Sequence, residues 1–462
     1  MTQDSRLNEF VAAAAEKFDV PGVSVGVLVD GRESYASHGV TSLEHPLPMD
    51  ERTLFPIASA TKTFTATALM RLAAEGRVDL DAPVRRYVPE LELADEETAA
   101  TVTVMNLLNH TSGLSWNVID TAGEDETLAG FVARLSRLEL IAAPGERASY
   151  SQAAYNLAGR VVEKVTEMPF EKAVASLVLE PVGLSDTFFD LDDVVTRKFA
   201  LGYNRGEDGG LRVATPWKAY RGGSRGNNPG GGGISSAGDL LRWARFHLGD
   251  GDGVLPAEAL RRMQEQTVEV RGSSLADGFG IGWFLREVDG VRVIKLGGSG
   301  NGQFSELLIV PERNFALVSL ANCGPDGHPF NQSVVRWALE HYLGVIEREP
   351  EPVPYDDARA REVAGRYEND AMNIDIAADG ARLTLAAEIK PEIRAASEAG
   401  MPPDYAPAGM GLLAGGGDEY VITGGGLQGE RGFFSRDENG AVVGIDLAGR
   451  LFTRTQAAPA AP

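Results

Sequence analysis

The sequence predicts a two-domain chain of the α/β (α+β) class, in which a mixed N-terminal domain precedes a small antiparallel β domain. Three observations support this prediction. Strand-like and helix-like segments alternate through about the first 350 residues, and a Pro- and Glu-rich stretch, 347-EREPEPVPY-355, then interrupts both patterns. Beyond it, short runs with a period of two residues dominate. We therefore expect domains at 1–346 and 356–462, joined by a linker at 347–355.

The N-terminal domain contains clear examples of both element types. The apolar run 20–29 is followed by Asp30-Gly31, a pair typical of a tight hairpin turn between two strands. Apolar residues recur at helical spacing over 58–74, and Gly76 is a typical helix stop. The same reasoning predicts helices at 152–166, 237–248 and 331–346, and strands at 291–294 and 306–310.

The C-terminal segment predicts a separate all-β module. Its alternating runs are divided by Gly and Asp-Gly turns, as in 373-NIDIAADGARLTLAAE-388 and 441-AVVGIDLAGRLFTRT-455. Several such runs at this spacing favour a small antiparallel barrel or sandwich.

Composition excludes several partners. The chain has 43 Lys and Arg residues against 66 Asp and Glu residues, a formal net charge of -23, which argues against nucleic acid and anionic lipid as partners. One cysteine rules out an internal disulfide framework. No run of 18 apolar residues occurs, and the polar first residues lack the layout of a signal peptide, so we expect a cytoplasmic protein without a membrane span.

The tetrad Ser59-Ala60-Thr61-Lys62 is the first candidate for chemistry. It stands where the apolar approach 54–57 turns into the predicted helix. A serine and a lysine three residues apart share one helix face. A buried lysine with a depressed pKa could take the serine proton, and a helix N-terminus favours a developing alkoxide.

Longer segments around this tetrad resemble the serine β-lactamase and penicillin-binding-protein superfamily. They are similar above all to the class C type β-lactamase-related hydrolases, which include esterases and D-aminopeptidases. The segments are 54-LFPIASATKTFTATALMRLAAEG-76, 102-VTVMNLLNHTSGL-114, 144-PGERASYSQAAYNLAGRVVEKVTEMPF-170, 230-GGGGISSAGDLLRWARFHL-248 and 296-LGGSGNGQFSELLIVPERNFALVSLAN-322. The resemblance covers nearly all of 1–346. It implies a β-lactamase/transpeptidase-like fold, an antiparallel sheet flanked by helices plus an all-α region. The tail, with 363-VAGRY-367, resembles the lipocalin-like barrels that follow some members.

The resemblance also implies the roles of individual residues. Ser59 falls on the acylated nucleophile and Lys62 on its partner base. Tyr150 falls on the tyrosine of a Tyr-x-Asn motif, and we expect a nearby lysine cation to lower its pKa. Here the asparagine of that motif is replaced by Gln152, which is one methylene longer but still an amide.

The third motif of the family is normally Lys-Thr-Gly or His-x-Gly on a strand at the edge of the cleft. The spacing to Pro311 places Leu296-Gly297-Gly298 there, whereas a one-residue shift would place Lys295 there. Strand side chains alternate between faces, so only one of Lys295 and Leu296 can face the cleft. The Pro311 spacing favours Leu296, and a bulge in this Gly-rich strand would favour Lys295.

The oxyanion hole of the family uses backbone N–H groups and therefore survives these replacements. By the resemblance it falls on Ser59 and Ser299. His110, in 109-NHTSG-113, is expected to be a packed structural residue.

These observations predict a serine hydrolase, an esterase, amidase or D-amino-acid peptidase that works through a Ser59 acyl-enzyme on a small-molecule or peptide substrate. No cofactor or metal is implied, and a homo-oligomer stays open. One alternative is an acyltransferase or cyclising thioesterase of natural-product biosynthesis. Another is a binding protein with weakened catalysis, suggested by Gln152 and Leu296. The role of the tail, a wall beside the cleft or an assembly module, is also open.

Overall fold

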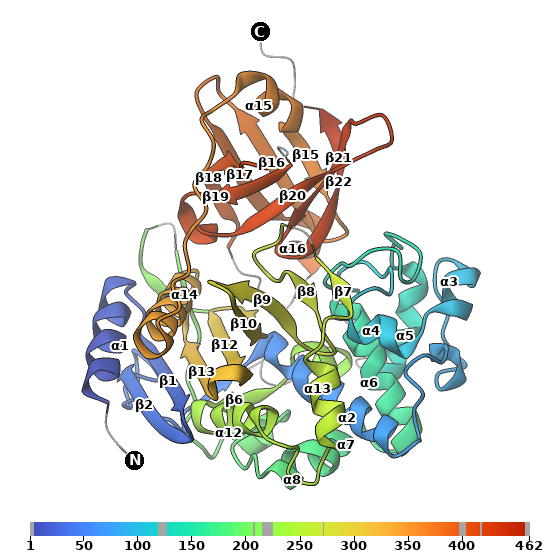
Figure 1. Ribbon diagram of the computed structural model, residues 1–462, viewed down its shortest axis with the longest axis vertical. Coiled ribbons are helices and arrows are strands. Elements are labelled where there is room, and N and C mark those ends of the chain that lie inside the picture. The colour runs from blue at the N-terminus through green and yellow to red at the C-terminus, as the bar shows by residue number, and fades with distance from the viewer. Residues whose placement is uncertain are drawn as a thin grey trace.

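A computed structural model shows the architecture of the chain. It describes residues 4–118, 127–206, 208–214, 225–270, 272–396, 403–415 and 418–457. Figure 1 shows a mixed body of sheet and helices with a β-barrel stacked on one end. Within the described ranges, no helix has the length and apolarity needed to cross a bilayer.

A nine-stranded sheet forms the centre of the body. Its order is β2-β1-β13-β12-β10-β9-β8-β7, with β11 paired to the free half of β12. The bounds are β1 (Gly22–Val29), β2 (Arg32–Gly39), β7 (Val268–Glu269), β8 (Gly278–Phe279), β9 (Phe284–Val288), β10 (Val291–Lys295), β11 (Gly298–Gly300), β12 (Gln303–Val310) and β13 (Phe315–Ala321). The predicted hairpin is β1–β2, and its Asp30 and Gly31 have the positive φ angles of a tight hairpin turn.

Helices cover both faces of this sheet, which explains why its central strands are apolar throughout. On one face α1 (Ser5–Lys17) and α14 (Gly327–Ala338) bury their apolar stripes against β1, β12 and β13. On the other face lie α2 (Lys62–Ala74) and α12 (Ala237–Leu248). The predicted closing helix begins at Gly327, earlier than expected, and ends in η7 (Leu339–Leu343).

A helical region packs beside α2 and completes the larger core. Its longest member is α6 (Gln152–Thr166), which has the predicted bounds. The remaining shorter helices of the body are α3 (Glu96–Thr101), α4 (Val104–Leu108), α5 (Leu128–Arg134), α7 (Phe170–Val174), α8 (Glu180–Val182), α9 (Leu191–Val194), α11 (Asn228–Gly231) and α13 (Ala257–Met263). The antiparallel sheet flanked by helices, with an added helical region, confirms the predicted fold class.

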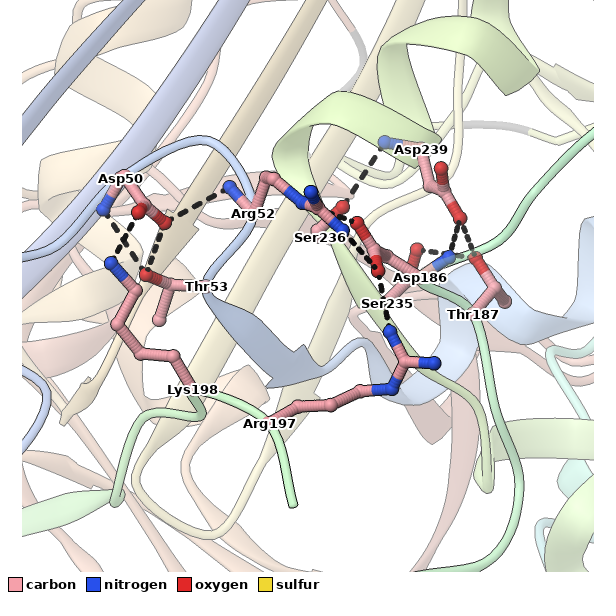
Figure 2. A network of polar contacts seen from close by, with 10 residues as sticks. All are labelled: Asp50, Arg52, Thr53, Asp186, Thr187, Arg197, Lys198, Ser235, Ser236 and Asp239. Atoms are coloured by element: carbon pink, nitrogen blue, oxygen red, sulfur yellow. Dashed lines mark hydrogen bonds and ion pairs between the residues drawn. The ribbon is translucent and has the colours of Figure 1, made fainter. Parts of the chain in front are cut away.

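A two-stranded ribbon, β3 (Leu54–Pro56) with β6 (Ile234–Ser236), leads into the candidate site. Figure 2 shows the polar network around it. The carboxylate of Asp239 accepts hydrogen bonds from the Asp186 backbone N–H at 2.6 Å and from Thr187 Oγ1 at 2.9 Å, and Arg52 binds Asp186 through two nitrogens. Ser236 caps the start of α12. The network ties the ribbon to the segments on both sides of it.

The C-terminal module is a closed antiparallel barrel of eight strands in sequence order, as its rhythm predicted. Its strands are β15 (Gly365–Glu368), β16 (Met372–Ala378), β17 (Leu383–Ile389), β18 (Tyr405–Leu412), β19 (Glu419–Ile422), β20 (Arg431–Arg436), β21 (Val442–Leu447) and β22 (Arg450–Ala457). The helix α15 (Asp357–Val363) contributes Ala360 and Val363 to the barrel core. The stretch before it carries no helix or strand, although Val353 N–H donates to Leu412 O at 2.8 Å.

The barrel contacts the body through polar bonds near the candidate site. His328 Nε2 lies 3.1 Å from Glu430 Oε1, and Ser274 N–H donates to Arg431 O at 3.1 Å. The Tyr150 backbone N–H donates to Gly449 O at 2.7 Å. The turn between β21 and β22 therefore lies directly on a residue that the sequence analysis assigned to the site.

Candidate active site

Ser59 lies in a strained turn at the end of the β3–β6 ribbon. The chain leaves β3, passes Ala58 with a φ of 45°, and enters a short 3-10 helix, η1 (Ala58–Thr61), that continues into α2. A positive φ is uncommon for a residue with a Cβ and stores strain. Ile57 N–H donates to Gly233 O at 2.9 Å and fixes the approach. Ser59 is half-buried, so a substrate can reach it.

Lys62 is completely buried, and its amine has three polar neighbours. Its Nζ lies 3.2 Å from Ser59 Oγ, 2.6 Å from Gln152 Oε1 and 2.7 Å from Gly230 O. Burial, aided by the charge of Arg450, holds the pKa of Lys62 well below its usual range, as the sequence analysis expected. A neutral amine has two N–H bonds and one lone pair. The two carbonyl oxygens take the two N–H bonds, which leaves the lone pair for the Ser59 hydroxyl.

Gln152, at the start of α6, fits the site because Gly230 makes room for it. A Cβ on Gly230 would lie 2.2 Å from Gln152 Nε2, so the longer amide fills the space that any other residue would occupy. Gly230 N–H donates to Asn156 Oδ1 at 3.1 Å, which anchors this loop to α6. Residues 225–233 of the glycine-rich segment therefore border the site; 222–224 lie outside the described residues.

Tyr150 is the next candidate catalytic residue, and aromatic rings pack around its side chain. Its side chain is buried, with His110 at 4.8 Å and Phe284 at 5.4 Å between ring centroids. Its hydroxyl makes no hydrogen bond of ordinary geometry with a described residue, although the Ser59 hydroxyl lies near enough to act on its pKa. His110 Nδ1 accepts from Ser151 N–H at 3.2 Å, and burial lowers the pKa of His110, so it is the packed neutral residue that was expected.

The expectation about the ionisation of Tyr150 was wrong. Burial raises the pKa of Tyr150, and the opposing influences are the Ser59 hydroxyl and the charge of Arg450, not a lysine cation. Lys62 Nζ lies 4.7 Å from the Tyr150 ring centroid, but burial lowers the pKa of Lys62 itself, which disfavours its cationic form. Tyr150 therefore keeps its proton at neutral pH and is suited to be an acid.

The strand of the third motif runs in continuous register. Lys295 pairs with Leu308 and Gly298 with Ser305, so no residue is inserted between them. Leu296 is completely buried in the same apolar cluster as Tyr150. Lys295 points to the other face, where its Nζ lies 3.6 Å from Glu306 Oε1. The face of this strand that is turned toward Tyr150 thus carries Leu296, and Lys295 lies on the opposite face.

Glycine is required where this strand passes the nucleophile. A Cβ on Gly298 would lie 2.2 Å from Ile57 O and 2.7 Å from Ser59 N. Gly297 faces the opposite side, toward Glu306. The next residue, Ser299, is exposed and lies on the edge strand β11 beside η1. The backbones of Ser59 and Ser299 are therefore brought to one side of the site.

The structure adds a residue that the sequence analysis missed. Arg450, the first residue of β22, reaches from the barrel to Tyr150, with its Cζ 5.1 Å from that ring centroid and 5.2 Å from the ring of Trp116. Trp116 belongs to the site, since its carbonyl accepts the N–H groups of Gln152 and Ala153. No motif marks Arg450, because 300 residues separate it from Tyr150.

The arrangement is that of a covalent catalyst. Among the described residues, no three His, Cys, Asp or Glu side chains are placed to hold a metal ion. A hydroxyl beside an amine of lowered pKa, a phenol of raised pKa and nearby backbone N–H groups are the parts that acyl transfer requires.

Comparison with known proteins identifies the family to which the chain is similar. The sequence matches the Beta-lactamase family over residues 7–339. It is 32% identical over 376 residues to Penicillin-binding protein 4 of Amycolatopsis lactamdurans, covering 77% of this chain and 97% of that protein. The structure of SurE, also solved with D-Leu, superposes with a TM-score of 0.74 at 25% identity, over 98% of this chain and 99% of that one.

A third similar structure, D-amino acid amidase from Ochrobactrum anthropi SV3 complexed with D-phenylalanine, has a TM-score of 0.62 at 24% identity. The match covers 71% of this chain and 98% of that one. The family match, the relative and the site geometry agree. The chain belongs to the beta-lactamase family and is a serine hydrolase of that family.

Proposed function

We propose that the protein cleaves amide or ester bonds through a Ser59 acyl-enzyme, and that its substrates include D-amino-acid residues. The observation that carries the catalytic part is the surround of Lys62, in which two carbonyl oxygens leave one lone pair for Ser59. The stereochemical part is supported by two similar structures, SurE with D-Leu and the amidase with D-phenylalanine.

In the acylation step, Ser59 Oγ attacks the substrate carbonyl carbon while its proton passes to Lys62 Nζ. The carbonyl oxygen becomes an oxyanion, which the N–H groups of Ser59 and Ser299 stabilise. As the tetrahedral intermediate collapses, the bond to the leaving atom breaks and Tyr150 Oη donates its proton to that atom. The raised pKa of Tyr150 suits this role, because the hydroxyl is protonated at neutral pH. The proton on Lys62 then restores Tyr150.

Deacylation is the reverse sequence with a different partner. Tyr150 first passes its proton to Lys62. Water then gives a proton to Tyr150 as it attacks the acyl carbon, and Ser59 Oγ takes the proton from Lys62 as its bond to that carbon breaks. An amine in place of water would give acyl transfer by the same steps, so hydrolase and transferase differ only in the acceptor that the site admits.

A covalent label tests the catalytic part. The protein is incubated with a fluorophosphonate and its intact mass is measured, with Ser59→Ala as the matched control. We expect one adduct, located on Ser59, and none on the variant. A folded protein that gains no adduct and turns over no p-nitrophenyl ester would support the alternative of a binding protein.

A pair of enantiomers tests the stereochemical part. D- and L-phenylalanine amides are compared at equal concentration, and ammonia release is measured. We expect faster release from the D-enantiomer. Equal rates, or a preference for the L-enantiomer, would contradict this part and leave the acyl-enzyme unaffected.

A further inference from the structure

His110 contacts both ends of the short segment that carries Tyr150. The backbone N–H of Ser149 donates to His110 O at 2.9 Å, and the N–H of Ser151 donates to His110 Nδ1 at 3.2 Å. The N–H between them, that of Tyr150, donates to Gly449 O at 2.7 Å. Three consecutive N–H groups are therefore bound, and only the bond to Nδ1 depends on the type of side chain that accepts it.

The backbone of His110 is in the left-handed region, with a φ of 60°, two residues after α4 ends at Leu108. A positive φ is uncommon for a residue with a Cβ, and glycine or asparagine is the usual residue at such a helix end. The histidine is nevertheless only 3% exposed. A buried polar side chain on an unfavourable backbone, next to a candidate catalytic residue, indicates a role for that side chain.

The imidazole of His110 is in the state needed to accept the hydrogen bond from Ser151. Burial, together with the charges of Lys62 and Arg450, holds the pKa of His110 well below its usual range, so the ring is neutral at pH 7. A neutral imidazole has one acceptor nitrogen, and here it is Nδ1. Ser151 is completely buried, so water cannot replace this acceptor without cost.

The imidazole also packs against the ring of Tyr150. The two ring centroids lie 4.8 Å apart and the ring planes meet at 60°. Phe284 packs on Tyr150 as well, with its ring centroid at 5.4 Å. Tyr150 Oη is buried and makes no hydrogen bond of ordinary geometry with a described residue. The position of this hydroxyl is therefore set by the backbone of Tyr150 and by the rings around it.

From this geometry we infer that His110 is a positioning residue that holds Tyr150 Oη where it can protonate the leaving atom. The inference rests on the proposed function. In that step the bond from the acyl carbon to the leaving atom breaks, its electron pair stays on the leaving atom, and that atom takes the Tyr150 proton. An alkoxide needs this proton in order to leave, whereas p-nitrophenolate is stable without it. A misplaced Tyr150 should therefore slow the cleavage of alkyl esters and spare that of p-nitrophenyl esters.

Two esters of one acyl group test this directly. The methyl and p-nitrophenyl esters of phenylacetylglycine differ only in the leaving group. Their acyl group is achiral, so the result does not depend on the stereochemical part of the proposed function. His110→Phe keeps an aromatic ring but offers no acceptor to the Ser151 N–H. We expect its kcat/KM for the methyl ester to fall by about 10- to 100-fold, part of what a general acid contributes, while kcat/KM for the p-nitrophenyl ester changes little.

The conservative variant His110→Asn restores an acceptor. Asparagine tolerates a positive φ, and its Oδ1 can accept the Ser151 N–H. This variant should regain most of the methyl-ester activity that His110→Phe loses. Equal losses for the two esters in His110→Phe, no loss for either ester, or a loss in His110→Asn as large as that in His110→Phe would overturn the inference.

A second buried histidine provides the control. His247 lies on α12 against the rings of Trp243 and Trp283, and neither of its ring nitrogens makes a hydrogen bond with a described residue. His247→Phe should leave the ratio of the two kcat/KM values unchanged. A selective loss as large as that in His110→Phe would show that any buried histidine has this effect, and would overturn the inference. The melting temperature and the fluorophosphonate labelling of Ser59 show that each variant is folded.

A double-mutant cycle tests whether His110 acts through Tyr150. Tyr150→Phe removes the acid itself and should be selectively slow on the methyl ester. Adding His110→Phe should lower kcat/KM no further, because no proton remains to be positioned, and a second loss of the same size would overturn the inference. If Tyr150→Phe spared both esters, the acid role of Tyr150 in the proposed function would itself be wrong. The inference alone fails when Tyr150→Phe is selective and His110→Phe is not.

Discussion

Substitution of Gly298 by alanine should close the oxyanion hole while leaving the catalytic side chains in place. The added Cβ would lie 2.2 Å from Ile57 O, 2.7 Å from Ser59 N and 2.9 Å from Ser305 Oγ. Two of these atoms belong to the backbone and cannot rotate away. Relief to 3.0 Å from Ile57 O requires a movement of about 0.8 Å between β11 and η1. That movement separates the N–H groups of Ser59 and Ser299.

The expected loss of kcat follows from the role of the Ser59 and Ser299 N–H groups in binding the oxyanion. Misplacing one oxyanion donor lowers kcat by about 10²- to 10³-fold, or about 3 to 4 kcal/mol of transition-state stabilisation. The assay is kcat for a p-nitrophenyl ester, with the melting temperature measured in parallel. Gly300→Ala, on the same strand, is the matched control, because the added Cβ would lie no closer than 3.8 Å to any neighbouring atom.

We expect Gly298→Ala to lose most of its activity and Gly300→Ala to keep it, with both proteins folded. Wild-type turnover by Gly298→Ala would refute the assignment of β11 as the oxyanion strand. Equal losses in the two variants would show that the strand is sensitive to any side chain.

Three further predictions concern charge and burial. Because burial lowers the pKa of Lys62, the enzyme should be active at pH 7 to 8, far below the usual lysine pKa of about 10.4. Its kcat/KM should fall on acidification, as Lys62 becomes protonated. The Lys62→Met variant should be inactive at every pH. The pKa of Asp446 is about 8 in the folded protein and about 3.9 in the unfolded chain, so between these pH values unfolding releases its proton. The contribution of Asp446 to the free energy of unfolding therefore declines from pH 4 to pH 8, by at most about 1.4 kcal/mol per pH unit. Asp446→Asn should therefore raise the melting temperature at pH 8 and have a diminishing effect toward pH 4. Asp239→Ala should cost about 2 to 4 kcal/mol in urea unfolding, because two buried donors lose their acceptor, whereas Arg52→Ala, which removes an exposed partner, should change little.

Much of the fold was predictable because the signals are local. The bounds of α6 and α12 follow from helical periodicity between clear caps, and the β1–β2 hairpin follows from Asp30-Gly31. The barrel followed from alternation and turn residues. The start of α14 was harder to predict, because Gly327 and the residues after it are weak helix formers that tertiary packing holds in place.

The sequence by itself brought the proposed nucleophile and its proposed base together, since Ser59 and Lys62 are neighbours on one helical turn and need no distant contact to meet. It also pointed to Tyr150, through resemblance to the family. Only the tertiary structure decided the direction of their pKa shifts, because burial depends on everything packed around a group: the pKa of Lys62 is lowered and that of Tyr150 is raised.

The tertiary structure also decided which side chain of the third motif is turned toward Tyr150 and which residue of the barrel lies over the Tyr150 ring. Register in a Gly-rich strand is set by its partner strand, and the contact between Gly449 and Tyr150 joins residues 299 positions apart. Spacing in a sequence carries no information about such contacts, because they join segments that are far apart along the chain. Arg450 is therefore visible only in the folded molecule.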